Sequence, residues 1–315
     1  VDMEDLIARE EMVVTITGGG YIKRVPLDTY RAQRRGGKGR SGMTMKDEDF
    51  ISDLFVADTH TPILFFTSRG IVHRMKVYQL PLGTPQSRGK ALVNMLPLEQ
   101  DEGVSVYMRL PEDEDEWEGM DIMFATSHGS VRRNKLSDFK NIRSNGLIAM
   151  KLGEGERLVS VRLCEGEADD VLLTSRLGKA IRFRANEIRV FAGRNSTGVR
   201  GIKLAPKDEV ISMSILKHVD ITAEERDAYM KAASQIVGSD DEGQDYSETT
   251  MELSQERFNE LLEKEELLLT ISEGGFGKRT SAYEYRVTGR GGQGIVNMAL
   301  TKKNGNAVAA TFPVT

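Results

Sequence analysis

The chain contains the stretch Ile63-Leu64-Phe65-Phe66-Thr67-Ser68-Arg69-Gly70-Ile71-Val72-His73-Arg74, in which an apolar run, a turn with glycine and a short basic segment follow one another. Apolar runs of four to six residues that are bounded by glycine indicate strands and not helices. Glycine supplies the positive φ that a tight hairpin requires. The stretch therefore predicts a β-hairpin that ends in basic residues.

The same order of parts recurs along the chain. The apolar runs that open the units are residues 12–16, 63–66, 122–125, 171–173 and 267–270. The glycine turns with their basic segments are residues 20–24, 70–74, 129–133, 178–182 and 275–279. Their glycines are 50, 59, 49 and 97 residues apart, and the last interval contains an acidic insertion. Self-similarity at a fixed period is the signature of a repeat architecture.

A unit of about 50 residues with about four strands has the size of one propeller blade. Because so small a unit cannot bury its apolar face alone, neighbouring blades must cover it. We therefore predict an all-β, propeller-like fold of about five four-stranded blades within one domain, 1–315. The blades are expected near residues 8–59, 60–119, 120–165, 169–218 and 266–315. A β-sandwich with coincidental spacing is the alternative, and the constant order of parts argues against it.

The insertion, 219–265, has a different pattern. Thr222-x-x-Glu225 is a capping box, and Ala-rich helical sequence follows it as far as Val237. Residues 239–250 are acidic and polar, which is typical of a disordered linker. Residues 254–266 are predicted to be helical, with Phe258, Leu261 and Leu262 on one face. Neither helix carries a catalytic constellation, so we interpret the insertion as a surface excursion between blades.

Charge is distributed unevenly. The chain has 43 Lys and Arg against 48 Asp and Glu, a formal net charge of −5. Residues 219–266 hold 15 acidic and 4 basic residues, so their local charge is −11 and the rest of the chain carries +6. The distribution matters more than the total for a nucleic-acid partner. The repeats are therefore compatible with a polyanion.

Other features exclude several classes of protein. Apolar runs are too short for a transmembrane helix, and the first residues do not resemble a signal peptide. Cys164 is the single cysteine, which excludes disulfides and favours a reducing cytoplasm. It lies in an apolar alternating strand, so we expect a buried thiol and not a nucleophile.

No catalytic or metal site emerges from the sequence. Residues 37–42 match the dinucleotide fingerprint in letters, but neither a hydrophobic strand before it nor an amphipathic helix after it is expected. The same loop fails as a P-loop because Gly39 stands where Ser or Thr must bind magnesium. The four histidines, His60, His73, His128 and His218, show no metal-ligand spacing. We therefore expect no cofactor and no metal in this chain.

The most specific string is Gln33-Arg34-Arg35-Gly36-Gly37-Lys38-Gly39, which holds three cations and three glycines in seven residues. Glycines let the backbone approach a phosphate, and their amides can donate to it. Arg and Lys add charge and donors for phosphate oxygens. Such a loop offers no rigid helix for the major groove, so it suits contact with the DNA backbone without base specificity. A solvated basic turn is the alternative.

This string resembles the signature box of the bacterial DNA gyrase A subunit, which lies in the first blade of its C-terminal domain. Shorter relatives of the box fall in the later repeats, at residues 86–90, 143–146, 194–198 and 289–294. The resemblance covers the chain apart from the insertion. It implies a β-pinwheel, a propeller-like disc with its own strand connectivity.

The resemblance also implies a function and partners. Members of the family wrap double-stranded DNA as a non-catalytic domain and enable ATP-dependent negative supercoiling by the holoenzyme. The implied partners are DNA and, in an A2B2 enzyme, the rest of the gyrase A subunit with the gyrase B subunit, without a membrane, while the isolated domain is expected to be a monomer. The catalytic tyrosine, ATP and magnesium would belong to other parts of the holoenzyme. The implied location is the bacterial cytoplasm, at the nucleoid.

The expected DNA-binding residues form two groups. The box, Gln33, Arg34, Arg35, Gly36, Gly37, Lys38 and Gly39, would fix the handedness of the wrap, as the resemblance implies. The second group comprises cations that recur once per repeat and are expected on an exposed rim: Lys23, Arg24, Arg74, Arg88, Lys90, Arg132, Arg133, Arg182, Arg194, Lys278, Arg279 and Arg290.

Two alternatives to this function stay open. The corresponding domain of topoisomerase IV has the same architecture, but its box is degraded or absent. A propeller-like scaffold for proteins would expose aromatic hot spots, whereas aromatic residues are 6% of this chain. Gyrase relatives commonly have six blades and five are counted here, so the sequence does not decide between a closed disc and an open spiral.

Overall fold

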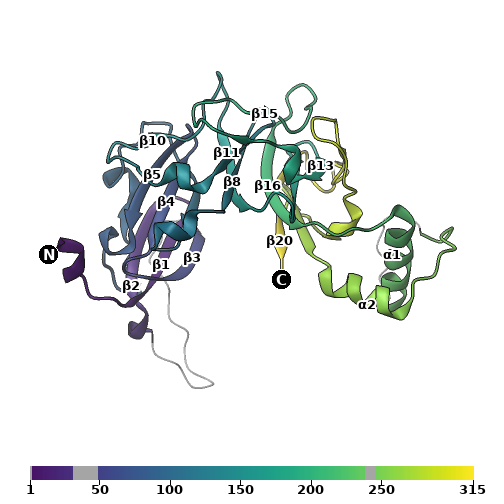
Figure 1. Cartoon of the computed structure of the whole chain (residues 1–315), viewed down its shortest axis with the longest axis horizontal. Coiled ribbons are helices and arrows are strands. Elements are labelled where there is room, and N and C mark those ends of the chain that lie inside the picture. Colours follow the sequence, from purple (N-terminus) through teal and green to yellow (C-terminus); the bar gives the residue numbers. More distant parts are fainter. Residues whose placement is uncertain (1, 31–48, 238–245) are drawn as a thin grey trace. The chain divides into compact units, whose positions relative to one another are not determined.

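The computed structural model describes residues 2–30, 49–237 and 246–315 (Figure 1). Strands make up most of the regular structure in these ranges, and both α-helices lie in the insertion. Five antiparallel sheets, with four, four, five, four and three strands, follow one another along the chain. The predicted all-β fold of about five blades is confirmed.

The first two sheets have the same kind of strand order. The first has the order β3-β1-β2-β6, with β1 (Glu11–Thr17), β2 (Tyr21–Pro26), β3 (Ile51–Asp58) and β6 (Lys90–Ala91). The second has the order β10-β5-β4-β7, with β4 (Pro62–Thr67), β5 (Ile71–Lys76), β7 (Val104–Arg109) and β10 (Leu147–Ile148).

The third and fourth sheets continue this pattern. The third has the order β11-β8-β9-β14, with β8 (Asp121–Thr126), β9 (Ser130–Lys135), β11 (Leu158–Cys164) and β14 (Val190–Phe191), and β15 (Val199–Arg200) also pairs with β9. The fourth has the order β16-β12-β13-β19, with β12 (Asp169–Ser175), β13 (Lys179–Arg184), β16 (Val210–Lys217) and β19 (Ile295–Val296). The fifth has the order β18-β17-β20, with β17 (Leu267–Ser272), β18 (Gly277–Ser281) and β20 (Val308–Val314).

Each of the first four sheets is completed by short strands from the next repeat. In the first sheet, β6 belongs to the second repeat and pairs with β2 through Ile22 and Lys90. In the fourth, β19 belongs to the fifth repeat and pairs with β13 through Ala180 and Ile295. A blade is therefore not built from one repeat alone, which corrects the expectation of about four strands within each 50-residue unit.

The hairpins form as the glycine turns predict. The amide of Gly70 donates to the carbonyl of Thr67 at 3.0 Å, and Gly70 has a φ of +77°. Every residue of β4 and of β12 is buried. Because both faces are covered, the apolar residues of each strand form a continuous run, 63–66 and 171–173, and not an alternation.

Two compact units can be distinguished within the described chain. The first comprises Val1–Met120, Asn134–Leu158 and Ala192–Ser196, and the second comprises Asp121–Arg133, Val159–Phe191 and Thr197–Thr315. In the first unit one core joins Ile16 of the first sheet to Phe65 of the second. In the second unit another core joins Met123 of the third sheet to Leu173 of the fourth. Neighbouring blades therefore bury one another's apolar faces within each unit.

The insertion contains helices α1 (Ala223–Val237) and α2 (Gln255–Lys264). The capping box of α1 is confirmed, because the Glu225 amide donates to Thr222 Oγ1 at 3.1 Å and the Thr222 amide donates to Glu225 Oε1 at 3.3 Å. Part of the expected linker lies outside the described residues, which resume at Tyr246. The Tyr246 hydroxyl donates to Glu284 Oε1 at 2.6 Å.

The insertion has a small core that includes a residue of the fifth repeat. Tyr229, Leu261 and Tyr283 are buried together, and Phe258 packs against them. The expected apolar face of α2 is correct for Phe258 and Leu261 but wrong for Leu262, which is 52% exposed. No helix of the described ranges is long and apolar enough to span a membrane.

Candidate nucleic-acid interface

The box, Gln33 to Gly39, lies outside the residues that the structure describes. The candidate interface is therefore built from the four later loops. Each of these loops starts or ends beside a short strand that pairs with the preceding repeat. Their positions follow from this pairing.

Equivalent hydrogen bonds fix the four loops to the turn glycines of the preceding repeats. Each turn glycine accepts, at its carbonyl oxygen, a backbone amide of the next repeat. The donor and acceptor pairs are Leu92 and Gly20 at 2.8 Å, Ala149 and Gly70 at 2.8 Å, Gly201 and Gly129 at 2.8 Å, and Asn297 and Gly178 at 2.7 Å. The junctions between successive repeats are thus alike in backbone geometry.

A glycine in each loop makes this close approach possible. Gly89, Gly146, Gly198 and Gly294 have φ values of +85°, +85°, +79° and +75°. A Cβ on Gly89 would lie 2.4 Å from the Ile22 carbonyl oxygen, and one on Gly198 would lie 2.3 Å from that of Val131. A side chain would therefore force the loop away from the strand on which it lies.

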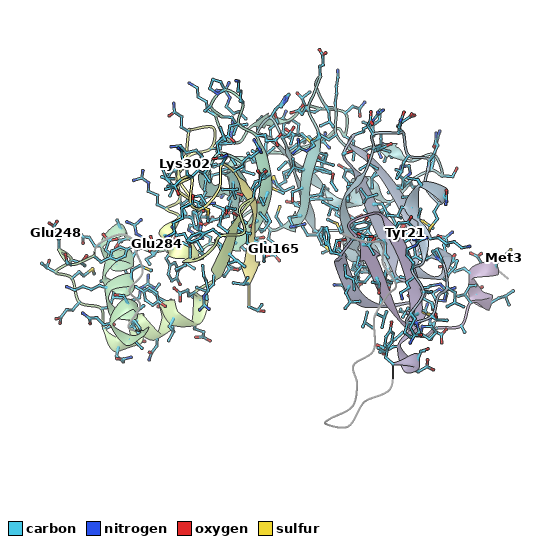
Figure 2. All side chains as sticks on the ribbon, turned by 180° about the vertical axis from the view of Figure 1, so that it is seen from behind. Met3, Tyr21, Glu165, Glu248, Glu284 and Lys302 are labelled. Atoms are coloured by element: carbon cyan, nitrogen blue, oxygen red, sulfur yellow. The ribbon has the colours of Figure 1, made fainter. Side chains whose placement is uncertain are left out.

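The docked loops hold cationic side chains at the surface. Arg88 and Lys90 are exposed, and the Arg88 guanidinium lies 4.7 Å from the centre of the Tyr21 ring, whose residue is labelled in Figure 2. Arg290 is also exposed, and its Nη1 donates to the Arg200 carbonyl at 3.0 Å. Exposed guanidinium and ammonium groups on a close-packed loop are suited to phosphate oxygens.

The loops of the third and fourth repeats line an open hollow of about 610 Å³. Arg143 and Arg194 contribute cations to it, and Asn141 and Asn145 contribute amide groups, beside one carboxylate, Asp138. Arg143 is exposed, whereas Arg194 is half-buried and its Nη1 donates to the Asp138 carbonyl at 3.1 Å. The hollow is therefore lined by two cations and one carboxylate.

The cations of the hairpins do not form the expected exposed rim. Lys23, Arg132, Arg133 and Arg182 are buried, with exposed fractions between 0% and 9%. Arg24 and Arg74 are half-buried. The expectation of exposed cations is therefore wrong for the four buried residues, whereas Arg24, Arg74 and Arg194 are partly exposed. The loop residues Arg88, Lys90 and Arg290 are exposed as expected.

Three of the hairpin cations, Arg182, Arg24 and Arg74, donate hydrogen bonds to carbonyl groups inside the protein. Arg182 Nε donates to Asp170 Oδ2 at 2.9 Å, and its Nη1 donates to the Ala282 carbonyl at 2.8 Å. Arg24 Nε donates to the Leu80 carbonyl at 2.9 Å. Arg74 Nη1 donates to the Lys140 carbonyl at 3.1 Å. In all three cases the carbonyl belongs to the next repeat, so these cations join consecutive repeats.

In the fifth repeat, unlike in the others, both expected rim cations of the hairpin are exposed. Lys278 and Arg279 on β18 are exposed. The strands that the structure describes place only β17 beside β18, so the other edge of β18 has no strand like those that complete the earlier sheets. Lys278 and Arg279 are therefore exposed, as expected of rim cations, because no strand of the described chain covers this edge of β18.

Sequence reasoning missed several exposed cations of the same loops. Arg143, Arg200 and Lys203 are exposed and lie within the shorter relatives of the box at 143–146 and 194–198 or within five residues after them. Their signal is the loop glycine that precedes or follows each of them, because this glycine marks the segment that lies on the neighbouring repeat. The basic segment after the turn glycine is the more regular pattern in the sequence, but four of its cations are buried in the structure.

The single thiol and the imidazole of His73 lie in the interior of the protein. Cys164 is buried, and burial raises the pKa of its thiol to about 12, which confirms the expected buried thiol. His73 is also buried, and the loss of solvation lowers the pKa of its imidazole, partly opposed by the charge of Glu102. Across residues 2–30, 49–237 and 246–315, no three His, Cys, Asp or Glu side chains are grouped to hold a metal ion.

Comparison with known proteins identifies the family. A model of the family described as DNA gyrase C-terminal domain, beta-propeller, matches residues 11–58, 61–116, 121–165, 169–217 and 266–315. The chain is 53% identical to the DNA gyrase A subunit of Granulibacter bethesdensis and 50% identical to that of Rickettsia bellii, and each alignment covers 99% of this chain and 35% of the relative. For the DNA gyrase A subunit of Escherichia coli the identity is 39%, over 98% of this chain and 30% of the relative.

Solved structures share the fold. The C-terminal domain of DNA topoisomerase IV matches with a TM-score of 0.69 and 21% identity, over 98% of this chain and 79% of that one. The DNA gyrase A C-terminal domain matches with a TM-score of 0.61 and 21% identity, over 97% and 83%. The chain spans about a third of the length of the curated relatives that it matches. Because each of the five matched segments contains the three long strands of one sheet, and together they cover most of the chain, the chain belongs to the family of DNA gyrase C-terminal domains.

Proposed function

We propose that this chain binds double-stranded DNA through its phosphates and wraps it, as the non-catalytic C-terminal part of a DNA gyrase A subunit. The observation that supports this most is the set of cations that docked glycine loops hold at the surface in successive repeats, such as Arg88, Arg143 and Arg290. A backbone that is fixed before binding keeps these charges in place, so little ordering is needed when DNA arrives.

The loops favour contact without base specificity. Base readout in the major groove requires a helix or a two-stranded ribbon that fits the groove. The candidate loops are short segments whose glycines pack closely on the preceding repeat and whose cations are exposed. Phosphate contacts position a protein on DNA and carry no sequence information. Binding should therefore be tolerant of sequence.

The distribution of charge supports the same proposal. Outside residues 219–266 the chain carries a net charge of +6, and the acidic residues of the insertion are separated from the repeats in sequence. Bending 20–30 base pairs through a large angle costs on the order of 1–6 kcal/mol. Several phosphate contacts must therefore act together, and loops that recur in each repeat supply them.

The wider assembly is part of the proposal. Relatives with 49–53% identity are A subunits of DNA gyrase, and this chain corresponds to about a third of their length. We propose that the rest of the gyrase A subunit, together with the gyrase B subunit, completes an A2B2 enzyme in the bacterial cytoplasm. The catalytic tyrosine, ATP and magnesium would then lie outside this chain, which wraps DNA so that the holoenzyme introduces negative supercoils.

The C-terminal domain of topoisomerase IV is the nearest alternative. Its structure has the higher TM-score, but at 21% identity this likeness concerns the fold alone. The gyrase names of the relatives and the complete string from Gln33 to Gly39 favour gyrase. A protein-interaction scaffold is less well supported, because the single tryptophan, Trp117, is fully buried.

A titration at two salt concentrations tests DNA binding. A labelled duplex of random sequence is mixed with the chain, and anisotropy is followed at 50 and 200 mM salt. If six to ten phosphates are neutralised, affinity should fall roughly 10³–10⁵-fold between the two conditions. A flat salt response, or no binding at 50 mM, contradicts the proposed function.

A further inference from the structure

Lys23 lies beneath the basic loop of the second repeat. Its side chain is fully buried, and its ammonium lies 2.9 Å from each of three carbonyl oxygens, those of Thr84, Pro85 and Ser87. An ammonium has three donors and no acceptor. All three can therefore be satisfied by this one turn, about 60 residues further along the chain.

A buried lysine needs a compensating arrangement. Loss of solvation disfavours the charged form of an amine and lowers its pKa, and burial acts on the pKa of Lys23 in this direction. Three carbonyl dipoles that point at the ammonium oppose this effect. The turn and the lysine therefore stabilise each other, and the turn is most stable when the ammonium is present.

The turn held by Lys23 leads directly into the exposed cations. Ser87 closes it, since its amide donates to the Thr84 carbonyl at 3.1 Å and its Oγ accepts from the Thr84 amide at 3.0 Å. Arg88 follows and stacks on Tyr21, and Lys90 pairs with Ile22. The loop is thus fixed to β2 from below by Lys23 and at its end by strand pairing.

We propose that Lys23 is a positioning residue for DNA binding, which holds the turn 84–87 on β2 so that Arg88 and Lys90 face the phosphates without touching DNA itself. This inference rests on the proposed function. It assigns a buried cation of the hairpin to the neighbouring loop and leaves contact with DNA to the exposed cations of that loop.

In other repeats too, the third residue after the turn glycine faces the loop of the next repeat. A Cβ on Gly146 would lie 2.7 Å from His73 Cε1, and one on Gly198 would lie 3.1 Å from Arg132 Cβ. His73 and Arg132 are, like Lys23, the third residue after the turn glycine. The side chain under each loop therefore differs in chemistry, lysine, histidine or arginine, while the loop keeps its place.

A double-mutant cycle tests the proposal. The variants are Lys23→Met, which keeps the length and removes the donors, the pair Arg88→Gln with Lys90→Gln, and all three together. We expect Lys23→Met to weaken duplex binding on the order of tenfold, because two long side chains would then have to be ordered on binding. The triple variant should bind no more weakly than the pair, since Lys23 acts only through these cations.

Three further variants separate positioning from loss of charge or of fold. Lys278→Met removes a lysine from the same position in the fifth repeat, where the side chain is exposed, and its losses should add to those of the pair. Lys23→Arg should restore most of the affinity, because Arg132 occupies this position in the third repeat. If Lys23→Met does not fold, Gly89→Ala takes its place in the cycle, since its Cβ would lie 2.4 Å from the Ile22 carbonyl and displace the loop.

Hydrogen exchange of the Ser87 and Leu92 amides gives a readout without DNA. Both should exchange faster in Lys23→Met than in Lys278→Met, because their carbonyl partners, Thr84 and Gly20, lie at the loop junction. Unchanged exchange, wild-type affinity of Lys23→Met, or additive losses in the triple variant would each overturn the positioning role. Failure of the wild-type chain to bind duplex would instead overturn the proposed function and with it the DNA part of this inference, while the exchange result would still report on the loop.

Discussion

The Tyr283 hydroxyl donates a hydrogen bond to the Leu261 carbonyl oxygen at 2.6 Å and so links the fifth repeat to helix α2. The Tyr283 ring also meets the Tyr229 ring edge to face, with their centres 5.3 Å apart. Burial raises the pKa of Tyr283 to about 12, so its hydroxyl stays protonated and remains a donor. The insertion is therefore packed against the fifth repeat at Tyr283 and is more than a tethered linker.

Replacement of residues 221–264 by a Gly-Ser linker should leave the five sheets folded. Glu266 must be kept, because the Lys217 amide donates to its Oε2 at 3.0 Å and the Ala282 amide donates to its carbonyl at 2.8 Å. The exposed Tyr283 ring should lower the Tm by about 2–4 °C, which corresponds to roughly 1–2 kcal/mol at this size. Scanning calorimetry measures the shift.

Tyr283→Ser in the same deletion is the matched control, since it removes the newly exposed ring and should recover part of the Tm. Cooperative loss of all sheets on deletion would show that the helices belong to the common core. Duplex affinity at low salt should stay equal or rise, because most of the local charge of −11 is removed and its repulsion acts over a Debye length of ~8–10 Å.

Stability and DNA binding should depend on different cations. Arg182→Met breaks a buried ion pair with Asp170, whose side chain is fully buried, and should cost about 3 kcal/mol. We expect a loss at the lower end of the range for broken buried ion pairs, because His218 Nδ1, 2.9 Å from Asp170 Oδ1, remains as a partner of this carboxylate. Arg88→Met removes an exposed guanidinium and should cost less than about 1 kcal/mol. Urea unfolding measures both.

Duplex titration of these two variants should give the opposite order. Arg88→Met should weaken binding and lower the salt slope by about 1, as expected when one phosphate contact is lost. Arg182→Met, measured where it is fully folded, should bind as the wild type does. Equal losses of affinity in both variants would mean that the buried cations reach DNA after all.

The loop glycines should be far more sensitive than nearby glycines. Gly198→Ala places a Cβ 2.3 Å from the Val131 carbonyl at a φ of +79°, so the loop must move. Strain of this kind costs on the order of 1–3 kcal/mol. Gly193→Ala is the control, since no atom lies within 4 Å of its added Cβ. Thermal unfolding of both variants tests this, and equal Tm values would show that the fourth loop is not held as described.

Sequence patterns predicted the hairpins, the turn glycines and the capping box at Thr222 because each depends on neighbouring residues. They could not predict the exchange of strands between repeats. The strands β6, β10, β14 and β19 have two residues each, which is too short for any periodic pattern. Their pairing depends on a loop that packs on a strand many residues earlier, and only the tertiary structure reveals this contact.

The candidate site was predicted only in part for the same reason. Lys23 and Arg88 look alike in the sequence, as cations within a few residues of a turn or loop glycine. Lys23 is buried because the loop of the next repeat covers it, whereas Arg88 is part of the covering loop and stays exposed. The burial of a strand residue is decided here by a segment about 60 residues away, so composition and spacing near Lys23 carry no sign of it.

His73 should make the folded chain sensitive to mild acid. The structure shows no hydrogen-bond partner for either ring nitrogen within the described residues, and burial lowers its pKa. Below the ordinary histidine pKa of about 6.5, the unfolded chain takes up a proton that the folded chain does not. Stability should therefore fall as the pH drops from 7 to 5. His73→Ile, which copies Ile181 of the fourth repeat, should flatten this dependence in urea unfolding, and an unchanged slope contradicts it.

The box itself gives the last prediction, which comes from the sequence because Gln33 to Gly39 lie outside the described residues. Arg34→Ala, Arg35→Ala and Lys38→Ala together should change the Tm little, since a loop of this composition is expected at the surface. Affinity for short duplexes should fall only modestly, because the loops of the other repeats keep their cations. The large effect should appear with DNA circles, which should retain little constrained writhe after relaxation in the presence of the triple variant. The reason is that closure of a wrap is a late and cooperative contact, so its loss opens the DNA loop without releasing the DNA.

Arg88→Gln with Lys90→Gln is the control, because it removes cations from an ordinary loop and should lower affinity and writhe in proportion. If the box variant constrains writhe as the wild type does, the box is a solvated basic turn, and wrapping depends on the docked loops alone.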